Sequence, residues 1–136
     1  MPLPEILNIG FKIDEEKLWQ EDIPTETINL SDLDNNLSIP YLEQEGTDDW
    51  NLSPQMLLDN FEKEISHAEK VLLTDLSYPI EIYFHQNQWI ILDGVHRFTK
   101  AHLKKAKTIK IRRISKEIAL RNCRDQKQGD AWDQFV

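Results

Sequence analysis

One cysteine, four glycines and the absence of any long apolar run set the first limits on this chain of 136 residues. A single cysteine, Cys123, cannot form an intramolecular disulfide, which excludes a small secreted domain held by disulfides and indicates a reducing compartment. No apolar stretch approaches the ~20 residues that a membrane-spanning helix needs, and the N-terminus does not resemble a secretory signal. We therefore expect a cytoplasmic protein that does not contact a membrane.

The sequence also lacks internal repeats, flexible linkers and several recurrent motifs of enzymes and metal sites. No Walker, HExxH, GxSxG or EF-hand pattern is present, and His67 and His85 have no companions at metal-ligand spacing. The length suits one domain with a hydrophobic core. We predict that residues 26–136 form this domain and that residues 1–25 form an arm packed on it.

Charge is distributed unevenly along the chain. Residues 94–127 hold 12 of the 16 Lys and Arg residues but only two of the 24 acids, Glu117 and Asp125. The net charge of the whole chain is −8, which repels DNA at long range and disfavours binding to duplex DNA. A phosphorylated small molecule needs only a few donors and is compatible with the basic segment. The alternative is a solvated basic face that acidic neighbours offset.

The first half of the chain predicts one strand and one long helix. ETINL (26–30) alternates as a strand does, whereas Ser53 and Pro54 are typical of a helix start. The residues after Pro54 predict one helix of about four to five turns with an apolar stripe. That stripe comprises Leu57, Leu58, Phe61, Ile65, Ala68, Val71 and Leu72.

The second half predicts a hairpin, a helix, a strand and a last helix. Residues 78–84 and 88–92 predict antiparallel strands joined by a short turn, with a helix directly after them. TIKIRRI (108–114) alternates as a strand, and we expect a final helix that is capped by Ser115 and ended by Gly129. Because an antiparallel hairpin interrupts the alternation of strands and helices, we predict an α+β fold rather than a doubly wound sheet.

The junction between the hairpin and the next helix has the sequence DGVHR. We expect Asp93 at the helix cap and Gly94 in a tight turn, which leaves the unpaired N–H groups and the positive dipole end of the helix facing outward. Such an end attracts anions, and a glycine there allows a phosphate to approach the backbone closely.

Basic side chains follow in the same helix, where they are unfavourable unless an anion is present. His96 and Arg97 lie in the first turn and Lys100 one turn later, so a bound phosphate would offset their charge. The alternative is a structural role, in which His96 and Arg97 pair with an acid of the protein itself, such as Glu81 or Asp75.

Residues 91–115, ILDGVHRFTKAHLKKAKTIKIRRIS, resemble the signature region of the ParB/sulfiredoxin superfamily, in which a Gly-x-His-Arg or Gly-x-Arg-Arg motif opens a helix. The Asp before the Gly is similar to the DGxHR branch, which includes ParB-like nuclease and free serine kinase domains. The resemblance implies a single compact domain with a mixed sheet, a β-hairpin and flanking helices. It also implies that a nucleotide, ATP or CTP with Mg²⁺, binds at this turn.

By similarity, the glycine, histidine and arginine of the motif contact the phosphates, and Asp93 orients the turn or helps to hold the metal. The backbone N–H beside the glycine and the lysine one turn later extend the anion site. The predicted phosphate-binding residues are Gly94, Val95, His96, Arg97 and Lys100.

Two departures from the superfamily narrow the implied function. Val95 stands where sulfiredoxins carry their reactive cysteine, and a valine cannot act as a thiolate nucleophile. About 20 residues follow the last predicted strand, which is too few for the helix-turn-helix and dimerisation segments of partition proteins. We therefore expect neither sulfiredoxin chemistry nor DNA partitioning.

An acidic loop, EQEGTDDW (43–50), is the candidate source of a catalytic acid or base. If it folds over the helix N-terminus, one carboxylate can act as general base or magnesium ligand, and we prefer Asp49 for catalysis because it adjoins the expected anchor, Trp50. Trp50 can also stack on a nucleotide base. The alternative is a solvated loop that Trp50 anchors to the core.

These patterns support two hypotheses. The first is a nucleotide-phosphate-binding domain that can act as a phosphotransferase on a small-molecule acceptor, whose identity the sequence does not reveal. The second is a non-catalytic module that binds a protein or nucleic acid partner. Magnesium-dependent turnover of ATP or CTP separates the two.

The valine at position 95 leads to a first test. The protein should show no sulfinic acid reductase activity on a hyperoxidised peroxiredoxin, because the motif has no thiolate to attack the substrate. Release of phosphate and recovery of the peroxiredoxin thiol would be measured together. Activity that disappears in Cys123→Ser would show instead that the lone cysteine is the nucleophile.

Overall fold

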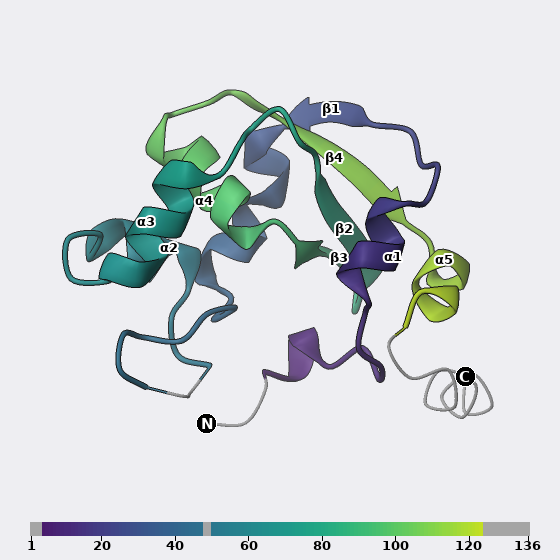
Figure 1. Ribbon diagram of the computed structural model, residues 1–136, viewed down its shortest axis with the longest axis horizontal. Coiled ribbons are helices and arrows are strands. Elements are labelled where there is room, and N and C mark those ends of the chain that lie inside the picture. The colour runs from purple at the N-terminus through teal and green to yellow at the C-terminus, as the bar shows by residue number, and fades with distance from the viewer. Residues whose placement is uncertain (1–3, 48–49, 124–136) are drawn as a thin grey trace.

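The computed structural model describes residues 4–47 and 50–123 of the chain. Its helices lie in two groups, with α2, α3 and α4 on one side of the sheet and α1 and α5 on the other (Figure 1). In chain order the elements are η1 (Glu5–Leu7), α1 (Glu15–Trp19), β1 (Glu26–Asn29), η2 (Leu30–Ser38), α2 (Pro54–Asp59), α3 (Ile65–Leu73), β2 (Ile80–His85), β3 (Gln88–Asp93), α4 (Val95–Leu103), β4 (Thr108–Ile114) and α5 (Lys116–Arg121), where η denotes a 3₁₀ helix.

In the described residues, four strands form one mixed sheet with the order β1-β4-β2-β3. The pairs β1–β4 and β2–β3 are antiparallel, whereas β2 and β4 are parallel, with β3 and α4 forming the connection between them. This arrangement confirms the predicted α+β class with a mixed sheet, a hairpin and flanking helices. No helix among residues 4–47 and 50–123 has the length and apolar character needed to cross a membrane.

The hairpin and the start of the following helix agree with the sequence prediction. β2 and β3 pair as far as His85 and Gln88, one residue further at the turn than predicted. Gln86 and Asn87 both have positive φ, 51° and 64°, as a two-residue turn of type I′ requires. α4 then begins at Val95.

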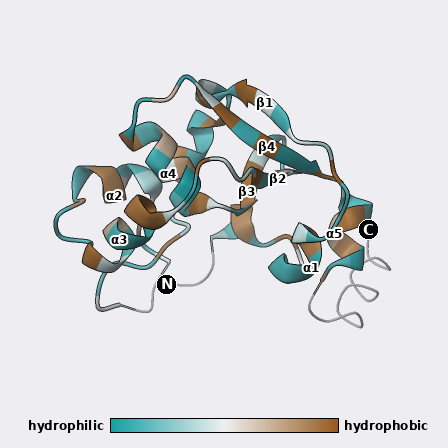
Figure 2. Ribbon diagram, turned by 45° about the horizontal axis from the view of Figure 1, so that its top comes forward, coloured by the Kyte–Doolittle hydropathy of each residue, from teal (hydrophilic) through white to brown (hydrophobic). Residues whose placement is uncertain are grey.

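The hydrophobic core joins the sheet to segments on both sides of it. Apolar and polar residues both occur along β4, whose isoleucines Ile109, Ile111 and Ile114 belong to this core (Figure 2). The N-terminal segment also contributes to the core rather than lying apart from it. Its buried members are Ile9, Phe11, Ile13 and Leu18, which belong to the same cluster as Ile80, Ile82, Phe98 and Ile111.

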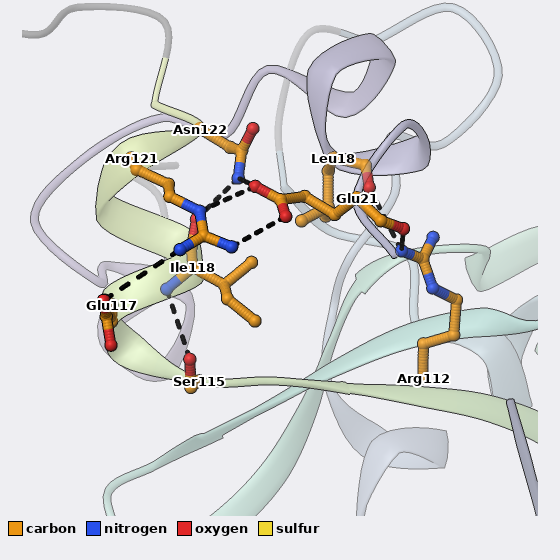
Figure 3. A network of polar contacts seen from close by, with 8 residues as sticks. All are labelled: Leu18, Glu21, Arg112, Ser115, Glu117, Ile118, Arg121 and Asn122. Atoms are coloured by element: carbon orange, nitrogen blue, oxygen red, sulfur yellow. Dashed lines mark hydrogen bonds and ion pairs between the residues drawn. The ribbon is translucent and has the colours of Figure 1, made fainter. Parts of the chain in front are cut away.

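A polar network links the end of α1 to β4 and α5 (Figure 3). The Glu21 carboxylate accepts two hydrogen bonds of 2.7 Å from Arg121 and one of 2.8 Å from Asn122. These bonds lower the pKa of Glu21 to about 2. From β4, Arg112 Nη2 donates to the carbonyl oxygens of Leu18 and Glu21, at 3.3 and 2.6 Å. The basic C-terminal half is therefore bonded directly to the acidic N-terminal segment.

The prediction of one long helix after Pro54 was wrong, because α2 and α3 are separate helices. The backbone and side-chain amides of Asn60 both donate to Met56 O, which ends α2. The chain then turns so that buried Glu64 accepts a 2.7 Å hydrogen bond from the backbone N–H of Glu45. As a result Ile65, expected in the apolar stripe, is 60% exposed.

The last helix begins as predicted and ends early. The Ser115 hydroxyl accepts a 3.2 Å hydrogen bond from the N–H of Ile118 and caps α5. α5 ends at Arg121, where the side chain of Asn122 donates to Ile118 O at 2.8 Å. The predicted end at Gly129 lies outside the described residues.

Gly94 occupies the turn between β3 and α4. Its φ is 105°, a conformation that L residues with a Cβ rarely adopt. A Cβ built there would lie 2.5 Å from Ile80 Cγ2 and 2.9 Å from Ile80 Cβ. The space that a side chain would fill is therefore occupied by β2, so glycine is required by packing as well as by φ.

We expect Gly94→Ala to lower the free energy of unfolding by about 2–4 kcal/mol, because a left-handed alanine and an overpacked contact with Ile80 add together. Gly46→Ala is the matched control, since Gly46 has a φ of 81° but nothing within 4 Å of the position that a Cβ would occupy. That control should lose about 1–2 kcal/mol. Urea denaturation of both variants measures the difference, and equal losses would contradict the role of Ile80.

Candidate functional site

The DGVHR junction forms an open helix N-terminus. Gly94 is the N-cap residue of α4, no side chain caps the helix, and its first turn contains no acidic residue. The prediction that Asp93 caps the helix was wrong, because Asp93 is the last residue of β3 and bonds elsewhere. The first backbone N–H groups of α4 have no partner within the helix, which gives this end a positive potential.

A cavity of about 260 Å³ lies at this helix end. It brings together five consecutive residues of the predicted site with one residue from the stem of the acidic loop and one from the segment after α3. Its lining residues are Leu42, Thr74, Leu92, Asp93, Gly94, Val95, His96 and Arg97.

Asp93 and Arg97 are bonded to each other and to their surroundings. Asp93 Oδ2 accepts a 2.8 Å hydrogen bond from the Trp19 indole and lies 3.3 Å from Arg97 Nη2. Arg97 Nη1 donates to the carbonyl oxygen of Pro79 at 2.5 Å. Asp93 is therefore the acid at ion-pair distance from Arg97, whereas Glu81 interacts with Arg97 only at longer range.

His96 belongs to a chain of hydrogen bonds that reaches the acidic loop. His67 Nε2 lies 2.6 Å from the carbonyl oxygen of Glu43, so this nitrogen donates. Its Nδ1 lies 3.1 Å from His96 Nε2, and the two rings stack with their centroids 5.4 Å apart. Burial, reinforced by nearby His67 and Lys70, lowers the pKa of His96 to about 4. His96 is thus a neutral group at pH 7.

The stem of the acidic loop lies beside the cavity. Leu42 lines the cavity and forms an isolated bridge with Leu52, which closes the loop at its base. Glu45 caps the start of α3, since its carboxylate accepts from the N–H and the hydroxyl of Ser66 at 3.2 and 2.9 Å. The predicted catalytic residue, Asp49, lies outside the described residues.

Two other predicted site residues do not line the cavity. Lys100 Nζ donates to the carbonyl oxygens of Leu72 and Thr74, at 3.0 and 2.7 Å, and so satisfies the C-terminal end of α3. Trp50, predicted to stack on a base, is half-buried and is not among the lining residues. Lys100 therefore links α4 to the C-terminal end of α3 through hydrogen bonds.

Asp93, the predicted metal contact, would offer a metal a single carboxylate. In the part of the chain that the structure describes, no cluster of three or more His, Cys, Asp or Glu residues could hold a metal by itself. A Mg²⁺ ion bound with a nucleotide takes most of its ligands from phosphate and water, so one or two carboxylates suffice. Asp93 therefore stays a predicted metal contact.

Sequence reasoning did not identify His67 or Thr74 as neighbours of the motif. His67 has no companion at metal-ligand spacing in the sequence, and it bonds to His96 across 29 positions of sequence. Both residues come from α3 and the segment after it, and packing of α3 on α4 brings them to the site. No local pattern around either residue signals this contact.

Comparisons of the chain with protein-family models, with curated proteins and with solved structures give no match.

The lowered pKa of His96 makes a pH-dependent prediction. A histidine with a folded pKa near 4 and an ordinary value of 6.5 contributes stability that is present above pH 6.5 and is lost as the pH falls through 4. The free energy of unfolding of the parent should therefore fall toward that of His96→Gln as the pH drops from 7 to 4. Urea denaturation at several pH values measures this difference, and a constant difference would contradict the assignment.

An NMR titration provides a direct check of the same group. The imidazole Cε1–H signal of His96 should titrate with a midpoint near pH 4. His85→Gln, at the far end of the hairpin, is the matched control and should leave this midpoint unchanged.

Proposed function

We propose that the protein binds the polyphosphate group of a nucleotide at the N-terminus of α4. The observation that carries this proposal is an uncapped helix end whose first turn has no acidic residue and which opens into a cavity lined by Asp93 to Arg97. Backbone N–H groups at such an end bind phosphate oxygens, and the helix dipole favours the negative charge. The resemblance to the DGxHR branch points to the same ligand.

Each lining residue has a distinct part in this proposal. The N–H groups of Val95 and His96 bind phosphate oxygens, and the neutral imidazole of His96 adds bulk beside them without adding charge. Arg97 turns from Asp93 to the phosphate, where its guanidinium can form two parallel hydrogen bonds. The carboxylate of Asp93 is then available to a Mg²⁺ ion or to one of its waters.

Phosphoryl transfer to a small acceptor is the reaction that the resemblance implies. Transfer depends on positioning and on charge neutralisation, for which the helix end, Arg97 and a bound Mg²⁺ would be suited. The loop that carries Asp49 has its stem at the cavity, since Leu42 lines it. A carboxylate from this loop is therefore the proposed general base.

One observation favours the alternative, a module that binds a macromolecular partner. α3 exposes Ile65, Leu72 and Leu73 at 60%, 54% and 84%, and residues seven positions apart lie on the same side of a helix. Grouped apolar side chains on a surface are typical of protein contacts. Nucleotide turnover distinguishes this alternative from an enzyme.

Titration calorimetry with ATP and CTP, each with and without Mg²⁺, tests the proposal. Arg97→Ala should weaken binding by about 10- to 100-fold, because charge-assisted hydrogen bonds contribute about 1.5–3 kcal/mol each. Arg97→Lys should recover part of the affinity, since it restores the positive charge but not the two parallel hydrogen bonds of a guanidinium group. Lys104→Ala is the matched control: it removes one charge from the other end of α4 and should leave the affinity unchanged.

Two outcomes would contradict the proposal. One is the absence of binding heat for both nucleotides in the parent protein under all four conditions. The other is equal affinity in the parent and Arg97→Lys combined with loss of folding in Arg97→Ala, which would make Arg97 a structural residue that holds Asp93 and Pro79. Circular dichroism of each variant establishes whether it is folded.

A further inference from the structure

A second and larger cavity, of about 540 Å³, adjoins the helix end. It shares Arg97 and Thr74 with the first cavity but is otherwise built from different segments, including α1, β2 and β4. Its lining residues are Trp19, Thr74, Asp75, Tyr78, Pro79, Glu81, Arg97 and Arg112.

A buried carboxyl group with an unused oxygen lies in the wall of this cavity. Glu81 is 2% exposed, and among the described residues its Oε2 has no hydrogen-bond partner. The other oxygen, Oε1, lies 3.7 Å from Arg112 Nη1, which is an ion-pair distance but too long for a hydrogen bond. A buried acceptor without a donor is costly, so a donor is expected from a molecule in the cavity.

The neighbouring cations are already engaged. Arg112 Nη2 donates to the carbonyl oxygens of Leu18 and Glu21, as Figure 3 shows. Arg97 donates to Pro79 O and lies against Asp93. The lining group that lacks a partner is thus Glu81, which requires a hydrogen-bond donor, whereas the guanidinium groups do not require an anion.

Two exposed aromatic side chains form another part of the lining. Trp19 is 53% exposed and Tyr78 is 66% exposed, although both are large apolar groups. Trp19 is held in place by its 2.8 Å hydrogen bond to Asp93. Aromatic faces that line a cavity bind flat or apolar ligands by stacking.

We propose that this cavity binds a small organic molecule that combines a flat apolar body with a hydroxyl or amino group. The donor of the ligand bonds to Glu81 Oε2, and its body packs against Trp19 and Tyr78. Such binding needs no nucleotide. If the proposed function holds, the ligand lies beside the bound polyphosphate. On that condition, this cavity is the binding site of the small molecule that accepts the phosphoryl group.

The ionisation of Glu81 sets the conditions of the test. Burial raises the pKa of Glu81 to about 7, with Asp93 adding to the shift and with Arg112 and Arg97 opposing it. At pH 8 the group is mainly a carboxylate and can accept from a ligand. Experiments are therefore set at pH 8.

NMR titration without nucleotide provides the test, with three fragments that differ at one group. Benzyl alcohol and benzylamine carry a donor, whereas benzyl methyl ether has the same ring but no donor. The two donor fragments should shift the Trp19 indole N–H signal and bind about tenfold more tightly than the ether, as expected for one hydrogen bond to a charged group. The alcohol and the amine together show whether a neutral or a cationic donor is preferred.

Two variants test the two parts of the cavity. Tyr78→Ala should weaken benzyl alcohol about three- to tenfold through loss of stacking. Phe84→Ala, which truncates another exposed aromatic outside this cavity, is the matched control and should leave the affinity unchanged. Glu81→Leu should remove the preference for alcohol over ether.

Failure of this inference and failure of the proposed function give different results. If all three fragments bind equally, or none binds, then no ligand donor bonds to Glu81 and water alone satisfies it. That result would overturn the proposal that this cavity binds a small organic molecule through Glu81. The proposal would also be overturned if Tyr78→Ala left the affinity for benzyl alcohol unchanged. This result can be obtained even if Glu81→Leu does not fold. Loss of nucleotide binding with intact fragment binding would overturn only the proposed function.

Discussion

The close approach of Gly94 to Ile80 is the contact on which the rest of the site depends. Because no side chain separates them, α4 begins directly against β2, and the residues at the start of the helix are held beside the strand. Pro79, which precedes Ile80, therefore lies within reach of Arg97. The same turn exposes the N–H groups of α4, so one packing constraint produces both the structural bond of Arg97 and the open helix end.

Part of the uneven charge of the sequence is offset by ion pairs in the fold. Arg113 bonds to Glu26 and Arg121 to Glu21, so two segments of opposite charge meet across the sheet and beside α5. The ion pair between Arg113 and Glu26 is exposed and contributes little to stability by itself. These two pairs join part of the basic segment to acidic residues of the N-terminal half.

Two carboxyl groups occupy facing positions on β2 and β3 and have different surroundings. Asp93 accepts hydrogen bonds from Trp19 and Arg97, whereas Glu81 has one oxygen without a donor among the described residues. The strand pairing that brings them together also contains a bulge beside Glu81, a feature that often occurs next to functional sites. Each cavity thus has one of these two acids in its lining, Asp93 with hydrogen-bond donors and Glu81 with an oxygen that lacks one.

The sequence by itself determined the hairpin, the strand 108–114, the start of α4 and the α+β class, because these depend on periodicity, turn residues and caps within a few positions of each other. It also brought Asp93 to Arg97 together, since they are consecutive. Only the tertiary structure decided that Arg97 also bonds to the carbonyl oxygen of Pro79, that Lys100 closes the end of α3, and that Glu64, in the turn between α2 and α3, bonds to Glu45. Those outcomes depend on contacts between residues distant along the chain, where local patterns carry no information about which groups meet.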